Sequence, residues 1–212
     1  MKGKIFNAQE VQAIIAGTKT MFREVIKTCK KHPNNVCKKV RNGHYGLNLK
    51  QDGLFWQPYG GSELQPFPYC DGKLSASNSL DEFCPYQVGQ KIFCKEAWGR
   101  KATGSGIAYK ADNPDQLIYQ HLPAKWRLPQ HMKQEHSRLT LEITDIKVER
   151  LKDISEEDAV NEGVWNIQEK GSPRNWDIKN AFATFWNATH KKPEEKFEVN
   201  PFVWVVDFKI NK

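Results

Sequence analysis

The sequence predicts an α+β fold: a small barrel of five to six mostly antiparallel strands, flanked by short helices, with a hairpin-rich insertion at about residues 28–83. Three observations lead to this prediction. Helical segments occur at three places, two of them with recognisable caps. Several other segments alternate between apolar and polar residues, and turn residues crowd the region 28–83. We therefore expect one domain over residues 1–212, with the insertion looped out of it.

The first helix is marked by its two ends. Asn7 suits the N-cap position, Glu10 follows three residues later as in a capping box, and Gly17 ends the segment. The buried face is predicted by apolar residues at helical spacing, which are Val11, Ile14 and Ile15.

An extended segment, GTKTMFREVIK at residues 17–27, follows this helix. On a regular strand its alternate side chains divide into two faces. One face carries Lys19, Met21, Arg23, Val25 and Lys27, and the other carries Thr20, Phe22, Glu24 and Ile26. Neither set is purely apolar, so periodicity does not orient the strand. The basic residues could contact a phosphate backbone, or the segment could be a charged edge strand that discourages aggregation.

Residues 28–83 differ in composition from the rest of the chain. The dipeptides NG at 42–43 and DG at 52–53 separate short segments, which predicts one or two β-hairpins. The stretch after them is rich in turn residues. We interpret the block as an insertion that could contact a protein partner.

Three further strands are predicted between residues 87 and 151. The segments QVGQKIFCKEAWGR and GIAYKAD come first, and SRLTLEITDIKVERL then alternates clearly. In the last segment Leu141 and Ile143 face inward, and the register shifts near Asp145 before Ile146 and Val148. Such a shift is typical of a β-bulge.

Two helices and a final strand complete the chain. The segment DISEEDAVNEG has Ser155 as N-cap, acidic residues in its first turn and Gly163 at its end. The segment NWDIKNAFATFWNATH places Ile178, Phe182 and Trp186 on one face. The last segment, NPFVWVVDFKI, is apolar enough to be a strand covered on both sides.

Charge and hydropathy limit the kinds of partner. The formal net charge of +7 suits a polyanion, because Lys and Arg that neutralise phosphates release counterions. No segment sustains an apolar run long enough for a membrane span or a secretory signal. We expect no membrane partner and a cytoplasmic location.

The chain has five cysteines, at Cys29, Cys37, Cys70, Cys84 and Cys94. Their odd number and the lack of a C-x-x-C pair favour reduced thiols. A zinc site is the alternative, because Cys29, His32 and Cys37 are close in sequence and Cys70 and Cys84 could complete a tetrahedron. We expect no metal and no other cofactor.

Several segments together resemble the ASCH domain, a PUA-like β-barrel family related to RNA-binding PUA domains. They are the opening helix ending in GTKT, then VGQKIFCKEAW, SRLTLEITDIKVERLKDISEEDAVNEGV and NPFVWVVDFK. The similarity is greatest to a phage- and prophage-encoded branch often labelled morphogenetic protein, which has segments like Trp126–Arg127, His131–Met132 and Ser137–Thr144. The resemblance covers most of the chain outside residues 28–83. It implies a PUA-like barrel and, if the chain is phage-encoded, a location in the host cytoplasm.

The resemblance also implies a cleft beside the opening helix that accepts a nucleotide or RNA. The catalytic lysine and glutamate of one branch fall on Lys19 and Glu162, and Thr20 supplies a neighbouring hydroxyl. With these three catalytic candidates the chain would be a hydrolase, either a ribonuclease or an acyl-cytidine amidohydrolase. However, Phe22 stands where that branch has its catalytic threonine, and Glu24 follows Arg23 where the phage branch has two basic residues. Both departures argue against the amidohydrolase chemistry.

Our first hypothesis is therefore RNA or nucleotide binding in a cationic cleft, and hydrolysis is the second. The third is a phage structural or host-interaction scaffold. The candidate contacts are Lys19, Thr20, Arg23, Lys27, Glu96, Trp98, Tyr109, Lys110, Trp126, Arg127, His131 and Arg138. Trp98 and Trp126 could stack on bases, or they could belong to the core. Glu96 could instead pair with a buried Arg23 or Arg138.

Overall fold

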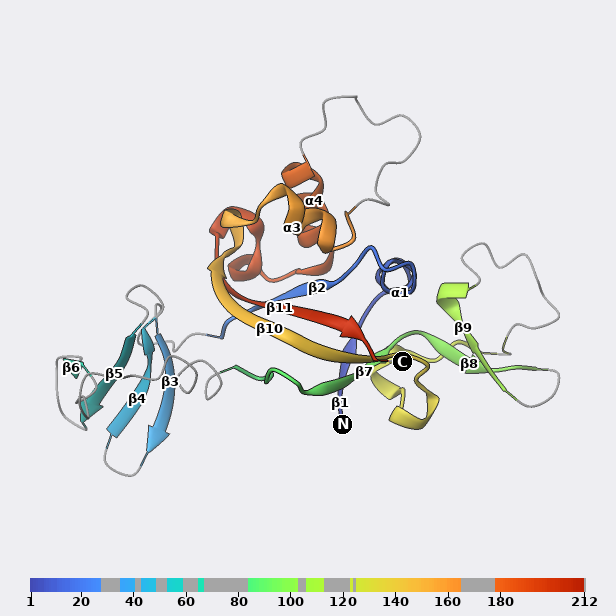
Figure 1. Cartoon of the computed structure of the whole chain (residues 1–212), viewed down its shortest axis with the longest axis horizontal. Coiled ribbons are helices and arrows are strands. Elements are labelled where there is room, and N and C mark those ends of the chain that lie inside the picture. The colour runs from blue at the N-terminus through green and yellow to red at the C-terminus, as the bar shows by residue number, and fades with distance from the viewer. Residues whose placement is uncertain are drawn as a thin grey trace.

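The computed structural model describes residues 1–27, 84–102, 106–112, 123, 125–164 and 178–211, together with the backbone of four strands between residues 35 and 66. Figure 1 shows a mixed α+β fold with a curved central sheet and helices packed against it. This confirms the α+β part of the predicted fold class. None of the described helices is long and apolar enough to cross a membrane.

The central sheet has five strands in the order β1-β7-β10-β11-β2. Their bounds are Lys2–Ile5 for β1, Lys91–Lys95 for β7, Thr140–Arg150 for β10, Phe202–Ile210 for β11 and Met21–Val25 for β2. The β1 and β7 strands run parallel, and the other neighbours are antiparallel. The predicted register shift in β10 is confirmed between Ile143 and Asp145. Strand β1 was not predicted, because its sequence, KGKI, is too short and polar to show a period.

The described strands do not form the closed barrel that the sequence led us to expect. The sheet ends at β1 on one side and at β2 on the other, and no backbone ladder joins them. Side chains connect the two edges instead: Lys4 Nζ donates to Glu24 at 2.7 Å, and the ring of Phe6 meets that of Phe22 edge-on at 6.0 Å. Because bulky side chains occupy this gap, the backbones of β1 and β2 stay too far apart to pair.

Three α-helices are described, and the caps of two of them explain where they begin. Helix α1 spans Ala8–Ile15, and Asn7 and Glu10 form the predicted capping box. Helix α3 spans Glu156–Asn161, and Ser155 accepts a hydrogen bond from the Asp158 N–H. Helix α4 spans Ile178–Thr189. Short 3-10 helices lie at Lys110–Asp112, Pro129–His131, Gln134–His136, Leu151–Asp153, Pro193–Glu195 and Phe197–Val199.

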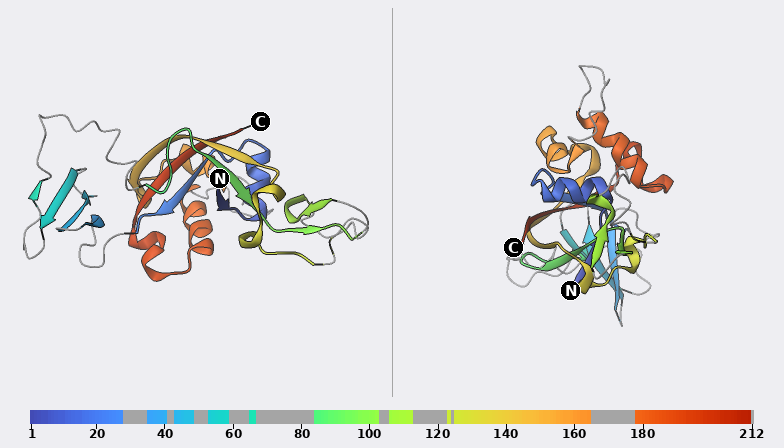
Figure 2. Two further views of the ribbon diagram at one scale, coloured as in Figure 1. Left: turned by 90° about the horizontal axis from the view of Figure 1, so that it is seen from below. Right: turned by 90° about the vertical axis from the view of Figure 1, so that its right-hand side faces the viewer.

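Two hydrophobic cores lie on the two faces of the central sheet. The first includes Phe22 and Ile26, with residues from β7, β10, β11 and α1. The second includes Met21, packed among α3 and α4 residues, with Val25 beside it. Figure 2 shows α3 and α4 on the same side of the sheet. The alternation along β2 therefore follows the predicted pattern, with Arg23 on the face covered by these two helices.

Two smaller sheets are described. In the region predicted as an insertion, β3 (Asn35–Val40), β4 (Gly43–Asn48), β5 (Gly53–Pro58) and β6 (Gln65–Pro66) form a four-stranded sheet in that order. The antiparallel pairs β3–β4 and β4–β5 confirm the predicted hairpins. The segment predicted as one strand from residue 87 is divided, because β8 (Trp98–Arg100) leaves the main sheet to pair with β9 (Ile107–Tyr109).

Candidate functional site

The chain turn after α1 places Lys19 inside the protein. Gly17 takes a positive φ of 75°, and the backbone N–H groups of Thr18 and Lys19 both donate to the Ala13 carbonyl. Lys19 then forms an isolated β-bridge with Glu162, which follows the last residue of α3. The ends of α1 and α3 are thereby joined, and the side chains of Lys19 and Glu162 become 1% and 4% exposed.

The ammonium of Lys19 is fully occupied by acceptors. Its Nζ donates to Oε2 and to the main-chain oxygen of Glu162, each at 2.8 Å, and lies 3.5 Å from Glu10 Oε1. An ammonium has three N–H donors, and this geometry supplies three acceptors. Lys19 therefore has no donor left for a ligand phosphate unless one of these contacts is broken.

Arg23 extends the same network. Its guanidinium donates to Glu162 Oε1 at 3.1 Å and Asp158 at 2.8 Å, with Glu149 at 3.4 Å. The ammonium of Lys147 forms an ion pair with the Glu149 carboxylate at 2.9 Å. The hydrogen bond to Glu149 raises the pKa of Lys147. The buried Nε of Arg23 has no hydrogen-bond partner among the residues that the structure describes. Arg23 therefore holds α3 and Glu162 against the sheet.

The charges of this network nearly cancel. Three cations, at Lys19, Arg23 and Lys147, meet four carboxylates, at Glu10, Glu149, Asp158 and Glu162. The geometry therefore does not match the expected cationic cleft around Lys19 and Arg23, because carboxylates neutralise each cation. These carboxylates come from other segments of the chain, so the alternation within one strand could not predict them.

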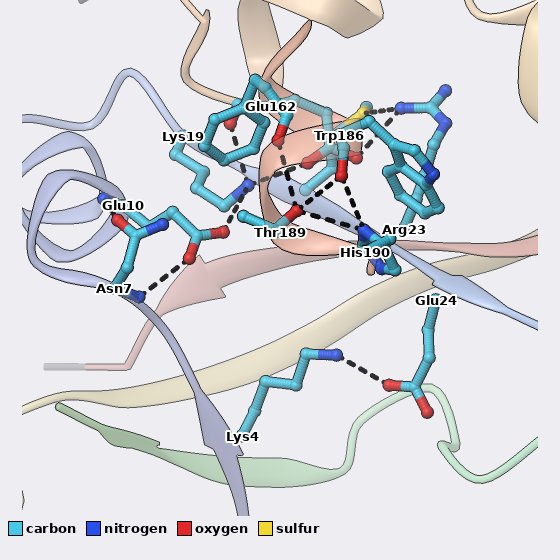
Figure 3. A network of polar contacts seen from close by, with 12 residues as sticks. Lys4, Asn7, Glu10, Lys19, Arg23, Glu24, Glu162, Trp186, Thr189 and His190 are labelled. Carbon is cyan, nitrogen blue, oxygen red and sulfur yellow. Dashed lines mark hydrogen bonds and ion pairs between the residues drawn. The ribbon is translucent and has the colours of Figure 1, made fainter. Parts of the chain in front are cut away.

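A cleft of about 350 Å³ opens next to this network. It lies at the gap between the two sheet edges, with the last turn of α4 on its other side (Figure 3). Its lining consists of Lys4, Ile5, Phe6, Asn7, Glu10, Phe22, Arg23, Glu162, Phe185, Trp186, Thr189 and His190. The unpaired edges of the sheet thus create the cleft, since a closed barrel would place a backbone ladder there.

Sequence analysis missed the contribution of α4 to this cleft. The His190 ring stacks on Trp186, with centroids 3.7 Å apart and planes 10° apart. Burial lowers the pKa of His190, although its contact with the Trp186 carbonyl and the charge of Glu195 act in the opposite direction. The only sequence signal was the WNATH segment at the helix end, where the spacing of Trp186 and His190 places both on one helix face.

The entrance to the cleft carries another ion pair. Glu24 accepts hydrogen bonds from Lys4 and from the Tyr86 hydroxyl, both at 2.7 Å. Lys2 lies 4.0 Å from the centre of the Tyr86 ring. Burial alone would raise the pKa of Glu24, but Lys4, Tyr86 and Lys2 together lower it. Lys4 is thus also engaged by a carboxylate.

Two of the predicted contact residues on the first extended segment lie away from this lining. The side chains of Thr20 and Lys27 are exposed, and neither lines the cleft. Thr20 contributes through its backbone, whose N–H donates to the Asn161 carbonyl and whose carbonyl accepts from Phe208. The cleft lining therefore includes Glu162 but neither Thr20 nor Lys19, whose ammonium is buried behind Glu162.

Most of the remaining candidates form a second group around β8 and β9. Glu96 is 1% exposed and accepts two hydrogen bonds from Arg138, at 2.9 and 3.0 Å. Arg138 also contacts both carboxylate oxygens of Asp112 and lies over the Tyr109 ring. The possible pairing of Glu96 with Arg138 is therefore observed. Burial raises the pKa of Glu96, and Arg138 partly offsets this effect.

The two tryptophans of this group differ in exposure. Trp98 is 2% exposed, and His136 and Arg127 lie against its ring, so it belongs to the interior and offers no face to a base. Trp126 is partly exposed. The side chains of Lys110, Arg127 and His131 are exposed, and none of this second group lines the cleft at Glu162.

The described residues contain no group of three side chains that could hold a metal ion. Cys84 and Cys94 are buried, and burial raises the pKa of the Cys94 thiol. The zinc alternative depends mainly on Cys29, His32 and Cys70, which lie outside the described residues, while only the backbone of Cys37 is described.

Comparison with known proteins gives no match for this chain, whether with family models, curated proteins or solved structures.

Proposed function

We propose that the cleft binds one nucleoside unit, either as a nucleotide or as part of RNA. The observation that carries this proposal is the lining of the cleft, which combines aromatic walls with two carboxylates, Glu10 and Glu162, in a volume of about 350 Å³. Pockets for small ligands have volumes from roughly 300 Å³ upward and combine apolar walls with a few polar groups. A base has flat apolar faces and N–H donors, and a ribose has hydroxyl donors, so both suit this lining.

The resemblance to the ASCH domain supports the same proposal. As part of the proposal, we interpret the curved sheet as a PUA-like arrangement. The charge distribution adds one requirement. Because the carboxylates of the network engage Lys19 and Arg23, a phosphate of the ligand is placed outside the floor of the cleft. The net charge of +7 then acts through exposed residues elsewhere on the surface.

Calorimetric titration with nucleosides, their 5′-monophosphates and short RNA tests this proposal. We expect a nucleoside and its monophosphate to bind within about threefold of each other, with little dependence on salt, because few phosphates are neutralised. Glu10→Gln should weaken binding, since it removes a charge from the lining. Glu142→Gln is the matched control, because Glu142 pairs with Lys209 at 3.2 Å and does not line the cleft. Binding that requires phosphates, or no nucleoside binding, would contradict the proposal.

Hydrolysis of an RNA or modified-nucleoside substrate is the second candidate. It is favoured by Glu162, which lines the cleft and contacts the buried Lys19 ammonium, because this carboxylate could orient a water molecule. Turnover of labelled RNA or acylated nucleosides tests it, and Glu162→Gln should abolish that turnover. If wild-type protein binds these compounds and leaves them unchanged, the cleft is a binding site only.

A further inference from the structure

The orientation of His190 in the cleft is fixed by its neighbours on α4. Its ring lies parallel to Trp186 and 3.7 Å from it. Its Nδ1 lies 3.2 Å from the Trp186 carbonyl oxygen and 3.1 Å from Thr189 Oγ1 (Figure 3). A rotation of the ring that moved Nδ1 away would lose the contacts with both oxygens.

These contacts determine which ring nitrogen carries the proton in neutral His190. A carbonyl oxygen only accepts hydrogen bonds, so the contact of Nδ1 with Trp186 is favourable only if Nδ1 is the donor. The Thr189 hydroxyl is compatible with this assignment, because its own proton can go to the Phe185 carbonyl at 3.3 Å. The Trp186 carbonyl then accepts two donors, the backbone N–H of His190 at 2.9 Å and Nδ1–H. The geometry points to a proton on Nδ1 and a lone pair on Nε2 in the neutral ring.

Nε2 is the ring nitrogen that remains for a ligand. Nε2 lies across the ring from Nδ1, which is turned toward α4. Within the described part of the chain Nε2 makes no hydrogen bond, and His190 is half-buried and lines the cleft.

We propose that His190 Nε2 accepts a hydrogen bond from the bound nucleoside unit, and that the cleft selects ligands with an N–H or O–H donor at this point. This inference rests on the proposed function. Two other polar groups of the lining support it, because the carboxylates of Glu10 and Glu162 also accept hydrogen bonds. Together with His190 they give the lining three acceptors for donors of the ligand.

Protonation should reverse this preference. Burial lowers the pKa of His190, so the ring is neutral at pH 7 and Nε2 is an acceptor. The charged groups acting on the ring are Glu195 and Glu10, which raise the pKa, and Lys4, which lowers it. Affinity for a donor ligand should be full above the lowered pKa and should fall as the pH drops through it.

The first arm of the test needs no ligand. Nitrogen-15 NMR of the histidine rings distinguishes a protonated from an unprotonated ring nitrogen, and the spectrum of His190→Gln identifies the His190 signals among the six histidines. We expect a protonated Nδ1 and an unprotonated Nε2 at neutral pH. A proton on Nε2 would overturn the inference, whatever the cleft binds.

The second arm compares nucleosides that differ in one donor. Adenosine and cytidine would be titrated beside purine riboside and pyrimidin-2-one riboside, which lack the exocyclic amine, and beside the 2′-deoxy forms. In wild-type protein, loss of one of these donors should weaken binding about three- to tenfold. In His190→Phe, which keeps a ring to stack on Trp186, that loss should have no further effect. His190→Gln, which can restore an acceptor, should recover part of the difference.

The outcomes separate the two proposals. If wild-type protein binds nucleosides, but each donor deletion weakens binding to His190→Phe as much as it weakens binding to wild type, the proposed role of His190 is wrong. The proposed function then stands. If wild-type protein binds no nucleoside, the proposed function and the ligand contact both fail, and the NMR arm still decides the protonation of the ring.

Discussion

Lys19 and Glu162 are linked by two hydrogen bonds, because the ammonium of Lys19 donates both to the carboxylate and to the main-chain oxygen of Glu162, each at 2.8 Å. The two residues are 143 positions apart, and both are almost fully buried. The contact holds the end of α1 against the end of α3 and fixes the carboxylate that lines the cleft. The stability of this region and the shape of the cleft therefore depend on the same ion pair.

Lys19→Met should reduce the free energy of unfolding by about 3–5 kcal/mol, because Glu162 stays buried after losing one of its two cationic partners. Urea denaturation measures this change. Lys209→Met is the control, because Lys209 is exposed and pairs with the partly exposed Glu142, so its loss should change stability by no more than about 0.5 kcal/mol.

The double variant Lys19→Met with Glu162→Gln should lose less stability than the sum of the two single variants. Removing both charges leaves no unpaired carboxylate at this point, although Arg23 then depends on Asp158 and Glu149 alone. Strictly additive losses would show that the two side chains do not interact in solution.

Gly163→Ala should destabilise the protein more than Gly89→Ala. Both glycines have a positive φ, 83° for Gly163 and 79° for Gly89, so both variants carry a backbone cost of about 1–2 kcal/mol. A Cβ at position 163 would lie 3.1 Å from Ala13 Cβ and 3.2 Å from Lys19 Cβ, whereas at position 89 it would meet nothing within 4 Å. The difference in unfolding free energy between the variants measures the crowding at Lys19. Equal losses would mean that Lys19 can move at little cost.

Arg138→Met should destabilise the protein by about 3–5 kcal/mol at pH 7 and by less near pH 4.5. Burial already raises the pKa of Glu96, and loss of Arg138 would raise it further. An acid with a raised pKa in the folded state opposes folding when ionised, so the penalty decreases as falling pH protonates Glu96. Unfolding experiments at both pH values test this. Arg138→Lys, which keeps the charge but loses the two-point contact, should fall between wild type and Arg138→Met.

Glu24→Gln should remove a pH-dependent part of the stability. Because neighbouring groups lower the pKa of Glu24, the folded state favours its ionised form, and the resulting stabilisation is present above the ordinary pKa of 4.5 and lost as the pH falls through the lowered value. The difference in unfolding free energy between wild type and Glu24→Gln should therefore shrink in acid. Tyr86→Phe, which removes one donor to Glu24, should reduce the same dependence. A difference that stays constant with pH would contradict this assignment.

The sequence by itself determined the local elements of this protein. The two helix caps and the β-bulge depend on residues that are close along the chain. The caps are formed by Asn7 with Glu10 and by Ser155, the bulge follows from the change of alternation at Asp145, and the structure has all three. The two faces of β2 were likewise visible in its alternation, because successive side chains of a strand point to opposite faces. That each face is covered by a core was not predicted. The pairing of Lys19 with Glu162 was suggested by family resemblance, since no local pattern connects residues so far apart.

Only the tertiary structure decided that the sheet is open between β1 and β2, that α4 supplies Trp186 and His190 to the gap, and that carboxylates neutralise Lys19 and Arg23. Each of these features depends on distances between separate elements. A strand pattern gives the direction of a side chain but not the charge or bulk of what it meets, so the electrostatics of the cleft could be determined only from the folded chain.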